Sequence, residues 1–323
     1  MRIFLTGLIS LCLTVFAHAE YSRTYLDSYP LKMASMGELD IAYRIVEPGP
    51  DKPKVVVIMG LGGSNVAWGD ALISGLANGG YEILLLDNRD TGDSTRFDDW
   101  GQPVLWWELL KYQLGFSVNA PYTLDDMGAD IAGLMDTVGY DEAHIIGASM
   151  GGMIAQIVAA QYPEKTRSLI SIMSTTNAPH LPPPTDEAEN RLRNLATGEA
   201  EADREQAIRD RGFYPESMQR HLMAIFKTGD RSDEVATIAA PTLVLHGADD
   251  GLVPPEHGRH TASLIPDSRF LLVKGMAHDM PEDIIPLLVD EMTGHMDAVE
   301  ASALASRELT TADKKVAPRG ATT

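Results

Sequence analysis

The pentapeptide Gly147-Ala148-Ser149-Met150-Gly151 decides the fold. It directly follows the apolar run 144–147 and opens an amphipathic segment at 151–161, which predicts a serine on a sharp turn between a strand and a helix. Such a turn holds the serine hydroxyl exposed on a strained backbone and needs small residues two positions before and after it. Gly147 and Gly151 meet this requirement. An incidental serine at a glycine-rich helix start is the alternative, and the strand-turn-helix context favours an activated serine.

Short apolar runs alternate with amphipathic segments on both sides of this turn. Runs 31–34 and 39–46 flank Gly37 and predict an antiparallel hairpin. The other runs are apolar at nearly every position, which is typical of strands buried on both faces. Their alternation with helical segments predicts an α/β fold with a doubly wound, mostly parallel sheet. The predicted strands are 55–59, 83–87, 144–147, 168–173, 243–246 and 270–273; the predicted helices are 67–78, 124–138 (with Thr123 and Asp126 as a capping box), 151–161, 256–264 and 284–296.

Two segments interrupt this alternation. Residues 178–238 open with three prolines and continue with polar, helix-forming sequence at 187–196 and 201–211, which predicts a small helical cap inserted into the core. The core itself then comprises residues 20–177 and 239–297. Residues 298–323 are rich in Ala, Ser and Thr and lack hydrophobic periodicity, so we expect a disordered tail.

The first residues, 1–19, are typical of a secretory signal peptide. Arg2 precedes an apolar run at 3–16, and Ala17-His18-Ala19 forms a cleavage pattern before Glu20. A membrane anchor is the alternative, but the run is shorter than the roughly 20 residues that a membrane span needs. The single cysteine, Cys12, lies in this segment behind a leucine, which argues against lipid attachment. The sequence therefore predicts an exported protein, periplasmic or secreted, without cysteine and without a membrane span.

The net charge of the chain indicates which classes of binding partner it favours. The 323 residues include 26 Lys and Arg against 46 Asp and Glu, for a formal net charge of −20. Without a positive field to attract phosphates, nucleic acid and anionic membrane surfaces are poor candidate partners, so we expect no nucleic-acid partner. The hydrophobic fraction of 44% is too high for a disordered chain.

Two further side chains would be needed to activate Ser149. A serine hydroxyl becomes a nucleophile when a base removes its proton and an acid orients that base. Asp250 lies in the loop after the predicted strand 243–246, and His278 follows the predicted strand 270–273. Asp249 is an alternative acid, although the spacing from His246-Gly247 and to Pro254 favours Asp250. The order Ser149, Asp250, His278 along the chain fits a serine hydrolase on such a sheet.

Other histidines are weaker candidates. His246 ends a predicted strand before a glycine and is interpreted as structural, and His144 lies at the end of its strand away from Ser149. His257 and His260 share a predicted helix at a spacing that could bind a metal ion, but no third ligand is nearby. We expect both to be solvated surface residues and predict no metal.

Backbone donors for an oxyanion are predicted at two places. The glycine-rich stretch Met59-Gly60-Leu61-Gly62-Gly63 follows the first long apolar strand and can present the N–H of Leu61, while the amide of Met150 would be the second donor. A dinucleotide-binding loop is the rival interpretation, and it fails because Asn65 stands where a Gly or Ala is required.

With these motifs the chain resembles the α/β-hydrolases that carry a cap domain, over residues 31–296. Met59-Gly60-Leu61-Gly62-Gly63, Asp87-Asn88-Arg89-Asp90 and the run Gly147 to Gln156 together resemble the esterases grouped with aclacinomycin methylesterase. The resemblance implies hydrolysis of a carboxylic ester and does not identify the ester. Acyl transfer by Ser149, His278 and Asp250 needs no metal or organic cofactor, and we predict none. Serine at position 149 argues against the related haloalkane dehalogenases and epoxide hydrolases, which use Asp there.

The stretch 100–116 departs from the family pattern. It is apolar nearly all round and contains Trp106 and Trp107. Burial in the core is one interpretation. The other is that both tryptophans bind substrate, as part of a lid that lines an apolar cleft or touches a lipid interface.

The sequence therefore predicts an exported serine hydrolase that cleaves an apolar small-molecule ester through an acyl-enzyme. An acyltransferase with the same three residues is the first alternative. A non-catalytic binding protein is the second, and the presence of Ser149, Asp250 and His278 together argues against it. The fold alone does not choose among these functions.

Overall fold

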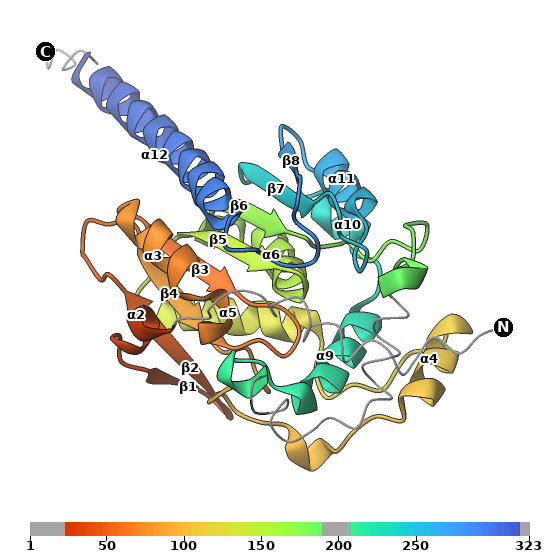
Figure 1. Ribbon diagram of the computed structural model, residues 1–323. Coiled ribbons are helices and arrows are strands. Elements are labelled where there is room, and N and C mark those ends of the chain that lie inside the picture. The colour runs from red at the N-terminus through yellow and green to blue at the C-terminus, as the bar shows by residue number, and fades with distance from the viewer. Residues whose placement is uncertain (1–22, 189–205, 207, 317–323) are drawn as a thin grey trace, which may run out of the picture.

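The computed structural model describes residues 23–188, 206 and 208–316 (Figure 1). Within these residues, eight strands form one sheet in the order β1-β2-β4-β3-β5-β6-β7-β8. Strands β1 and β2 are antiparallel to their neighbours, and the pairs from β4 through β3 to β8 are parallel. The strands are β1 (Lys32–Met36), β2 (Leu39–Val46), β3 (Lys54–Ile58), β4 (Glu82–Leu86), β5 (Ala143–Ala148), β6 (Thr166–Ile172), β7 (Thr242–Gly247) and β8 (Arg269–Val273).

Helices cover both faces of this sheet. Helices α3 and α12 pack together on one face, while α5 packs on α6, and α10 joins α6 to α11. The α-helices are α2 (Thr24–Asp27), α3 (Asp70–Asn78), α4 (Leu105–Gln113), α5 (Leu124–Val138), α6 (Met150–Gln161), α9 (Pro215–Thr228), α10 (Ser232–Val235), α11 (Pro255–Leu264) and α12 (Ile285–Val316).

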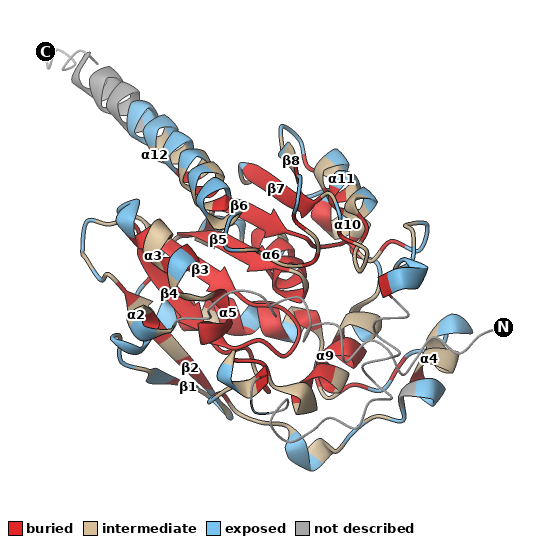
Figure 2. Ribbon diagram, in the orientation of Figure 1, coloured by how far each residue is buried: buried red, intermediate tan, exposed pale blue. Residues whose placement is uncertain are grey.

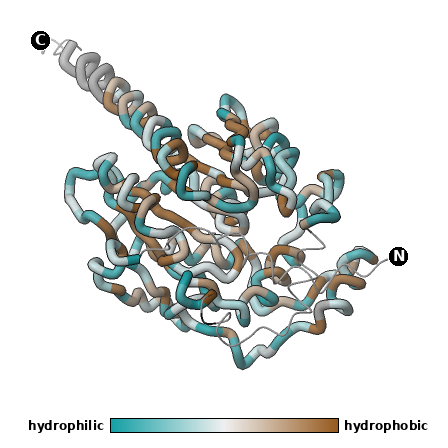
Figure 3. Tube along the Cα trace, in the orientation of Figure 1, coloured by the Kyte–Doolittle hydropathy of each residue, from teal (hydrophilic) through white to brown (hydrophobic). Residues whose placement is uncertain are grey.

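The sheet is the apolar core, as its sequence predicts. Every residue of β4 and β5 is buried, because helices cover both faces (Figure 2). The same strands carry much of the apolar sequence in the hydropathy view (Figure 3). The doubly wound, mostly parallel sheet is confirmed, and the antiparallel hairpin β1–β2 turns at Gly37, whose φ is +70°.

The sheet order brings two loops together. Strand β3 lies between β4 and β5, so the chain moves to one side of β3 for β4 and to the other side for β5. Loops at such a reversal point meet at the carboxyl edge of a parallel sheet. The loop after β3, residues 59–64, therefore lies against the turn after β5 that holds Ser149.

The prediction of a disordered tail from residue 298 is wrong as far as Val316, because α12 continues to that residue. The early turns of α12 are fixed by packing, with Leu288, Met292 and Met296 fully buried. A helix nucleated in this way extends through Ala-rich sequence, since Ala has the highest helix propensity. Residues 301–306 of α12 are mostly exposed (Figure 2), which explains why they have no apolar stripe.

Other predicted segments are described only in part. Of the predicted cap, residues 178–238, the structure describes α9, α10 and the stretches around them, while most of 187–196 and part of 201–211 lie outside the described residues. The predicted signal peptide, 1–19, and Cys12 also lie outside them. Among the helices that the structure describes, none combines the length and apolarity that crossing a membrane requires.

Candidate active site

Ser149 occupies the strained turn that its neighbours predict. Its backbone has φ +56° and ψ −120°, a conformation that a residue with a side chain rarely adopts. The Ser149 N–H donates to the Ile172 carbonyl at 2.9 Å, which ties the turn to the end of β6. A Cβ on Gly147 would overlap the Gly151 carbonyl, and one on Gly151 would overlap that of Ile58. Both glycines are therefore required for the close approach of α6 to β3 and β5.

The structure brings Ser149, His278 and Asp250 together. The Oγ of Ser149 lies 3.0 Å from Nε2 of His278, and Nδ1 of His278 lies 2.8 Å from Oδ2 of Asp250. The other oxygen of Asp250 accepts the backbone N–H groups of Leu252 and Val253 at 3.0 and 2.9 Å. The three side chains follow the carboxyl ends of β5, β7 and β8. Together they form one chain of hydrogen bonds from the carboxylate to the hydroxyl.

Asp250, and not Asp249, contacts His278. Asp250 is buried, whereas Asp249 is exposed. Burial alone would raise the pKa of Asp250, but the adjacent His278, the hydrogen bond from His246 and the Val253 N–H hold it well below its usual range. The acid beside His278 is therefore ionised at neutral pH.

His246 also contacts the acid, which the sequence interpretation did not foresee. Its Nε2 lies 2.8 Å from the Val253 carbonyl and 3.4 Å from Oδ2 of Asp250. The carbonyl can only accept, so Nε2 of His246 carries the proton. The residue is fully buried. His246 is structural, as expected, and the structure that it holds is the 250–253 turn.

The glycine-rich loop after β3 lies against Ser149. A Cβ on Gly60 would lie 3.0 Å from Cβ of Ser149 and 3.5 Å from the Met150 nitrogen. Within the described part of the chain, neither the Leu61 nor the Met150 N–H donates a hydrogen bond. Met150 begins α6, whose first amides carry the positive end of the helix dipole. Both amides are thus available to a negative oxygen beside Ser149.

Trp106 and Trp107 are exposed on α4, with 59% and 49% of their surface accessible. Burial in the core, one of the two interpretations of this stretch, is therefore wrong for both. Their rings contact each other at 5.8 Å between centroids. Three more exposed apolar side chains lie on the same stretch: Val104, Leu114 and Phe116.

The remaining histidines take structural positions. His257 is half-buried rather than solvated, since its Nδ1 lies 2.6 Å from Oγ1 of Thr175 and its Nε2 lies 2.9 Å from the Pro182 carbonyl. His260 lies against Ser232 at 3.2 Å. His144 is buried at the far end of β5. Across the described ranges, no three His, Cys, Asp or Glu side chains are grouped so that they could hold a metal ion.

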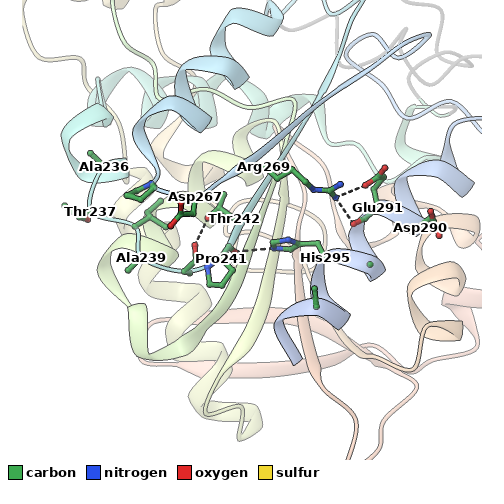
Figure 4. Close-up of a pocket in the computed structure, with 15 residues that line it drawn as sticks. Ala236, Thr237, Ala239, Pro241, Thr242, Asp267, Arg269, Asp290, Glu291 and His295 are labelled. Atoms are coloured by element: carbon green, nitrogen blue, oxygen red, sulfur yellow. Dashed lines mark hydrogen bonds and ion pairs between the residues drawn. The ribbon is translucent and has the colours of Figure 1, made fainter. Parts of the chain in front are cut away.

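A hollow of about 910 Å³ lies at the other edge of the sheet (Figure 4). Its lining comes from the amino ends of β7 and β8 and from α12. Arg269 pairs there with Glu291 at 2.7 Å, and His295 lies 3.3 Å from the Pro241 carbonyl. Ser149, Asp250 and His278 follow the carboxyl ends of their strands, so this hollow is separate from the candidate active site.

The loop after β4 is held by a buried ion pair that sequence reasoning missed. Asp90 accepts from Nε and Nη2 of Arg220 at 2.5 and 2.7 Å and from the Tyr122 hydroxyl at 2.7 Å. Asp90 has φ +69°, and Arg220 comes from α9, 130 residues further along the chain. The sequence motif Asp87-Asn88-Arg89-Asp90 resembles that of the esterase family, but no spacing in the sequence indicates that Arg220 pairs with Asp90.

The chain matches the family described as alpha/beta hydrolase fold over residues 53–214. It belongs to this family. Rhodomycin D methylesterase DauP of Streptomyces sp. (strain C5) is 24% identical over 314 residues, covering 83% of this chain and 99% of the relative. RutD of Caulobacter sp. (strain K31), provisionally named a carbamate hydrolase, is 26% identical over 255 residues, 72% of this chain and 87% of its own.

Solved structures agree on the fold of this α/β hydrolase. The enol-lactonase from Burkholderia xenovorans LB400 superimposes with a TM-score of 0.61 at 18% identity, covering 82% of this chain and 100% of the enol-lactonase. The resemblance to the methylesterase subgroup is confirmed by the relatives named rhodomycin D methylesterase. The chain is thus an α/β hydrolase with esterase and other hydrolase relatives.

Proposed function

We propose that the protein is an exported serine esterase that hydrolyses a small, apolar carboxylic ester through an acyl-enzyme on Ser149. The observation that carries this proposal is the continuous chain of hydrogen bonds from Asp250 through His278 to the Oγ of Ser149. An incidental serine at a helix start has no need of a base at 3.0 Å or of a buried acid behind that base. The methylesterase relatives favour an ester as substrate.

Acylation begins when Nε2 of His278 takes the Ser149 proton while Oγ attacks the ester carbonyl carbon. The carbonyl π electrons move to the oxygen, and the amides of Leu61 and Met150 donate to the resulting oxyanion. Asp250 keeps the proton on Nδ1 of His278 and stabilises the imidazolium. As the carbonyl reforms, the C–O bond to the alcohol breaks and His278 protonates the leaving alkoxide.

Deacylation repeats these steps with water. His278 takes a proton from a water molecule, whose oxygen attacks the acyl carbon, and the acid is released as Ser149 regains its proton. Every proton removed by His278 is returned within one cycle. The reaction therefore needs only the side chains and amides already named.

Hydrolysis of nitrophenyl esters from acetate to palmitate tests the proposal directly. The hydrolysis rates of the mature chain, residues 20–323, and of its Ser149→Ala variant would be compared. We expect the variant to lose activity by a factor on the order of 1,000 or more. Retention of most of the rate by a folded Ser149→Ala protein would overturn the assignment. Adding a competing alcohol separates the acyltransferase alternative, since a transferase would form a new ester in preference to the free acid.

Export is the second part of the proposal, supported by the signal-peptide pattern of residues 1–19. Expression of the full chain in a bacterial host, followed by cell fractionation and N-terminal sequencing, is the test. A mature protein outside the cytoplasm that begins at Glu20 is expected. An uncleaved chain in the membrane fraction would favour the anchor instead.

A further inference from the structure

Residues 212–221, at the start of α9 and just before it, are hydrogen-bonded to the glycine-rich loop after β3, residues 59–64. The Gly62 carbonyl accepts the Tyr214 N–H at 2.8 Å, and the Gly62 N–H donates to Nδ1 of His221 at 3.1 Å. Two residues further, the Ser64 N–H donates to the Gly212 carbonyl at 2.8 Å. Both polar groups of Gly62 are thus bonded to residues about 150 positions away in the chain.

These hydrogen bonds fix the orientation of the peptide between Gly60 and Leu61, which carries the Leu61 N–H. The Gly63 N–H donates to the Gly60 carbonyl at 3.0 Å, and in a trans peptide the carbonyl and the following N–H point in opposite directions. The Leu61 N–H is therefore directed away from the Gly60–Gly63 turn. The direction holds only while this turn holds. Glycine adopts the φ of +66° at Gly62 without strain, but it is also the most flexible residue, so the hydrogen bonds to Tyr214 and His221 restrict the turn to this conformation.

His221 is placed between this loop and the loop after β4. The side chain is fully buried, and its Nε2 lies 3.1 Å from the Arg89 carbonyl, with Oγ1 of Thr91 at 3.5 Å. A carbonyl on one side and an N–H on the other require the neutral tautomer with the proton on Nε2. Burial favours the neutral form and lowers the pKa of His221 to about 4. Its neighbour Arg220 is fixed in the ion pair with Asp90.

We propose that His221 is a positioning residue for the oxyanion hole, acting through the Gly62 N–H to hold the Leu61 amide toward Ser149. The inference rests on the proposed function, because it gives the Leu61 amide a catalytic task. It also makes α9 part of the catalytic frame: the helix holds the loop that would stabilise the transition state. A helix that merely covered the site would not need a buried imidazole bonded to that loop.

Three substitutions separate this role from simple support of the fold. In His221→Asn the amide oxygen replaces Nδ1 and can still accept the Gly62 N–H. In His221→Gln the amide nitrogen replaces Nε2 and can still donate to the Arg89 carbonyl. His221→Leu removes both hydrogen bonds. The matched control is His144→Leu, which removes another buried histidine, located at the end of β5 remote from Ser149.

The measurements are kcat and KM for nitrophenyl butyrate and the inhibition constant of phenylboronic acid, whose tetrahedral adduct on the serine places an oxygen in the oxyanion hole. We expect His221→Leu to lower kcat by about 10- to 100-fold with KM changed by less than about 3-fold, since the oxyanion forms only after binding. Boronate affinity should fall in parallel with kcat. His221→Asn should keep more of both than His221→Gln, and His144→Leu should lower Tm alone.

The inference is overturned if folded His221→Leu keeps its kcat, or if Gln supports catalysis as well as Asn. It is also overturned if kcat falls while boronate affinity does not. If His221→Leu does not fold, the comparison of Asn with Gln decides alone. Esterase activity that survives Ser149→Ala would instead refute the proposed function, so the two failures are distinguishable.

Discussion

Nε2 of His246 lies 3.4 Å from Oδ2 of Asp250, the oxygen that also accepts from Nδ1 of His278 at 2.8 Å. The acid is thus held between two histidines. His246 reaches it from the carboxyl end of strand β7, and its shorter contact, 2.8 Å to the Val253 carbonyl, closes the turn that carries the carboxylate. The orientation of His278 therefore depends on a residue that does not touch Ser149.

Replacing His246 by Leu should affect both stability and rate. The Val253 carbonyl would lose its buried partner, at a cost of about 1–3 kcal/mol in the free energy of unfolding. A looser 250–253 turn should lower kcat by roughly 10-fold. Urea denaturation and esterase kinetics measure the two effects. His246→Gln, whose amide nitrogen can still reach the carbonyl, should recover most of the rate, and a Gln variant no better than Leu would contradict this role.

Asp250 and Asp249 form a matched pair of adjacent carboxylates. Asp250→Asn keeps the shape of the acid but removes the charge that stabilises the imidazolium, so kcat should fall on the order of 100-fold or more. Asp249→Asn changes an exposed side chain and should leave kcat within about 2-fold. Equal losses in the two variants would mean that His278 does not depend on Asp250.

Stability should fall as the pH drops below neutral, because two buried histidines resist protonation. Burial lowers the pKa of His144 and of His221 from 6.5 to about 4. The unfolded chain therefore binds these protons first, and stability present above about pH 6.5 is lost as the pH falls toward 4. Each residue contributes up to about 3 kcal/mol to this loss.

The free energy of unfolding at about pH 7.5 and about pH 4.5 measures this loss, with urea as denaturant. His144→Gln should show a smaller decline than the parent chain, since the variant lacks one of the histidines that burial keeps neutral. A parallel decline in both proteins would contradict a contribution from His144. The carboxylates other than Glu300, whose Oε1 lies 3.3 Å from Nε2 of His144, titrate in the same range in both chains, so their contribution to the decline cancels in the comparison.

Local sequence predicts well the parts of the fold that local physics decides. Helix α5 begins and ends where its capping box and apolar stripe predict, with the Thr123 and Asp126 hydrogen bonds in place. The strand-turn-helix context likewise predicts the backbone at Ser149, because Gly147 and Gly151 leave space that other residues would fill. Chain order and loop position then suffice to select Asp250 and His278.

Contacts made by distant segments were not predictable in this way. His221 and Arg220 are adjacent polar residues on an amphipathic helix, and only the fold places one on Gly62 and the other on Asp90. The outer half of α12 was missed for the opposite reason: its helix continues from a packed start without an apolar pattern of its own. Periodicity reports burial, so it does not detect a helix that projects into solvent.

The exposed aromatic stretch on α4 leads to the last prediction. Trp106 and Trp107 expose large rings that a folded protein normally covers, and Leu114 and Phe116 each expose 64% of their surface nearby. Helix α4 also packs beside α9, where Tyr112 contacts Phe226 at 4.7 Å between ring centroids.

If Trp106 and Trp107 bind the acyl chain or an ester aggregate, replacing both by Ala should reduce kcat/KM more for long nitrophenyl esters than for the acetate. The expected difference is about 5-fold or more for each indole contact of about 1 kcal/mol. Leu304→Ala is the control, since it removes an apolar side chain that is 58% exposed on α12. An unchanged chain-length preference in the double variant would exclude substrate binding by this pair, because removal of a ring that touches the acyl chain must weaken long substrates more than short ones.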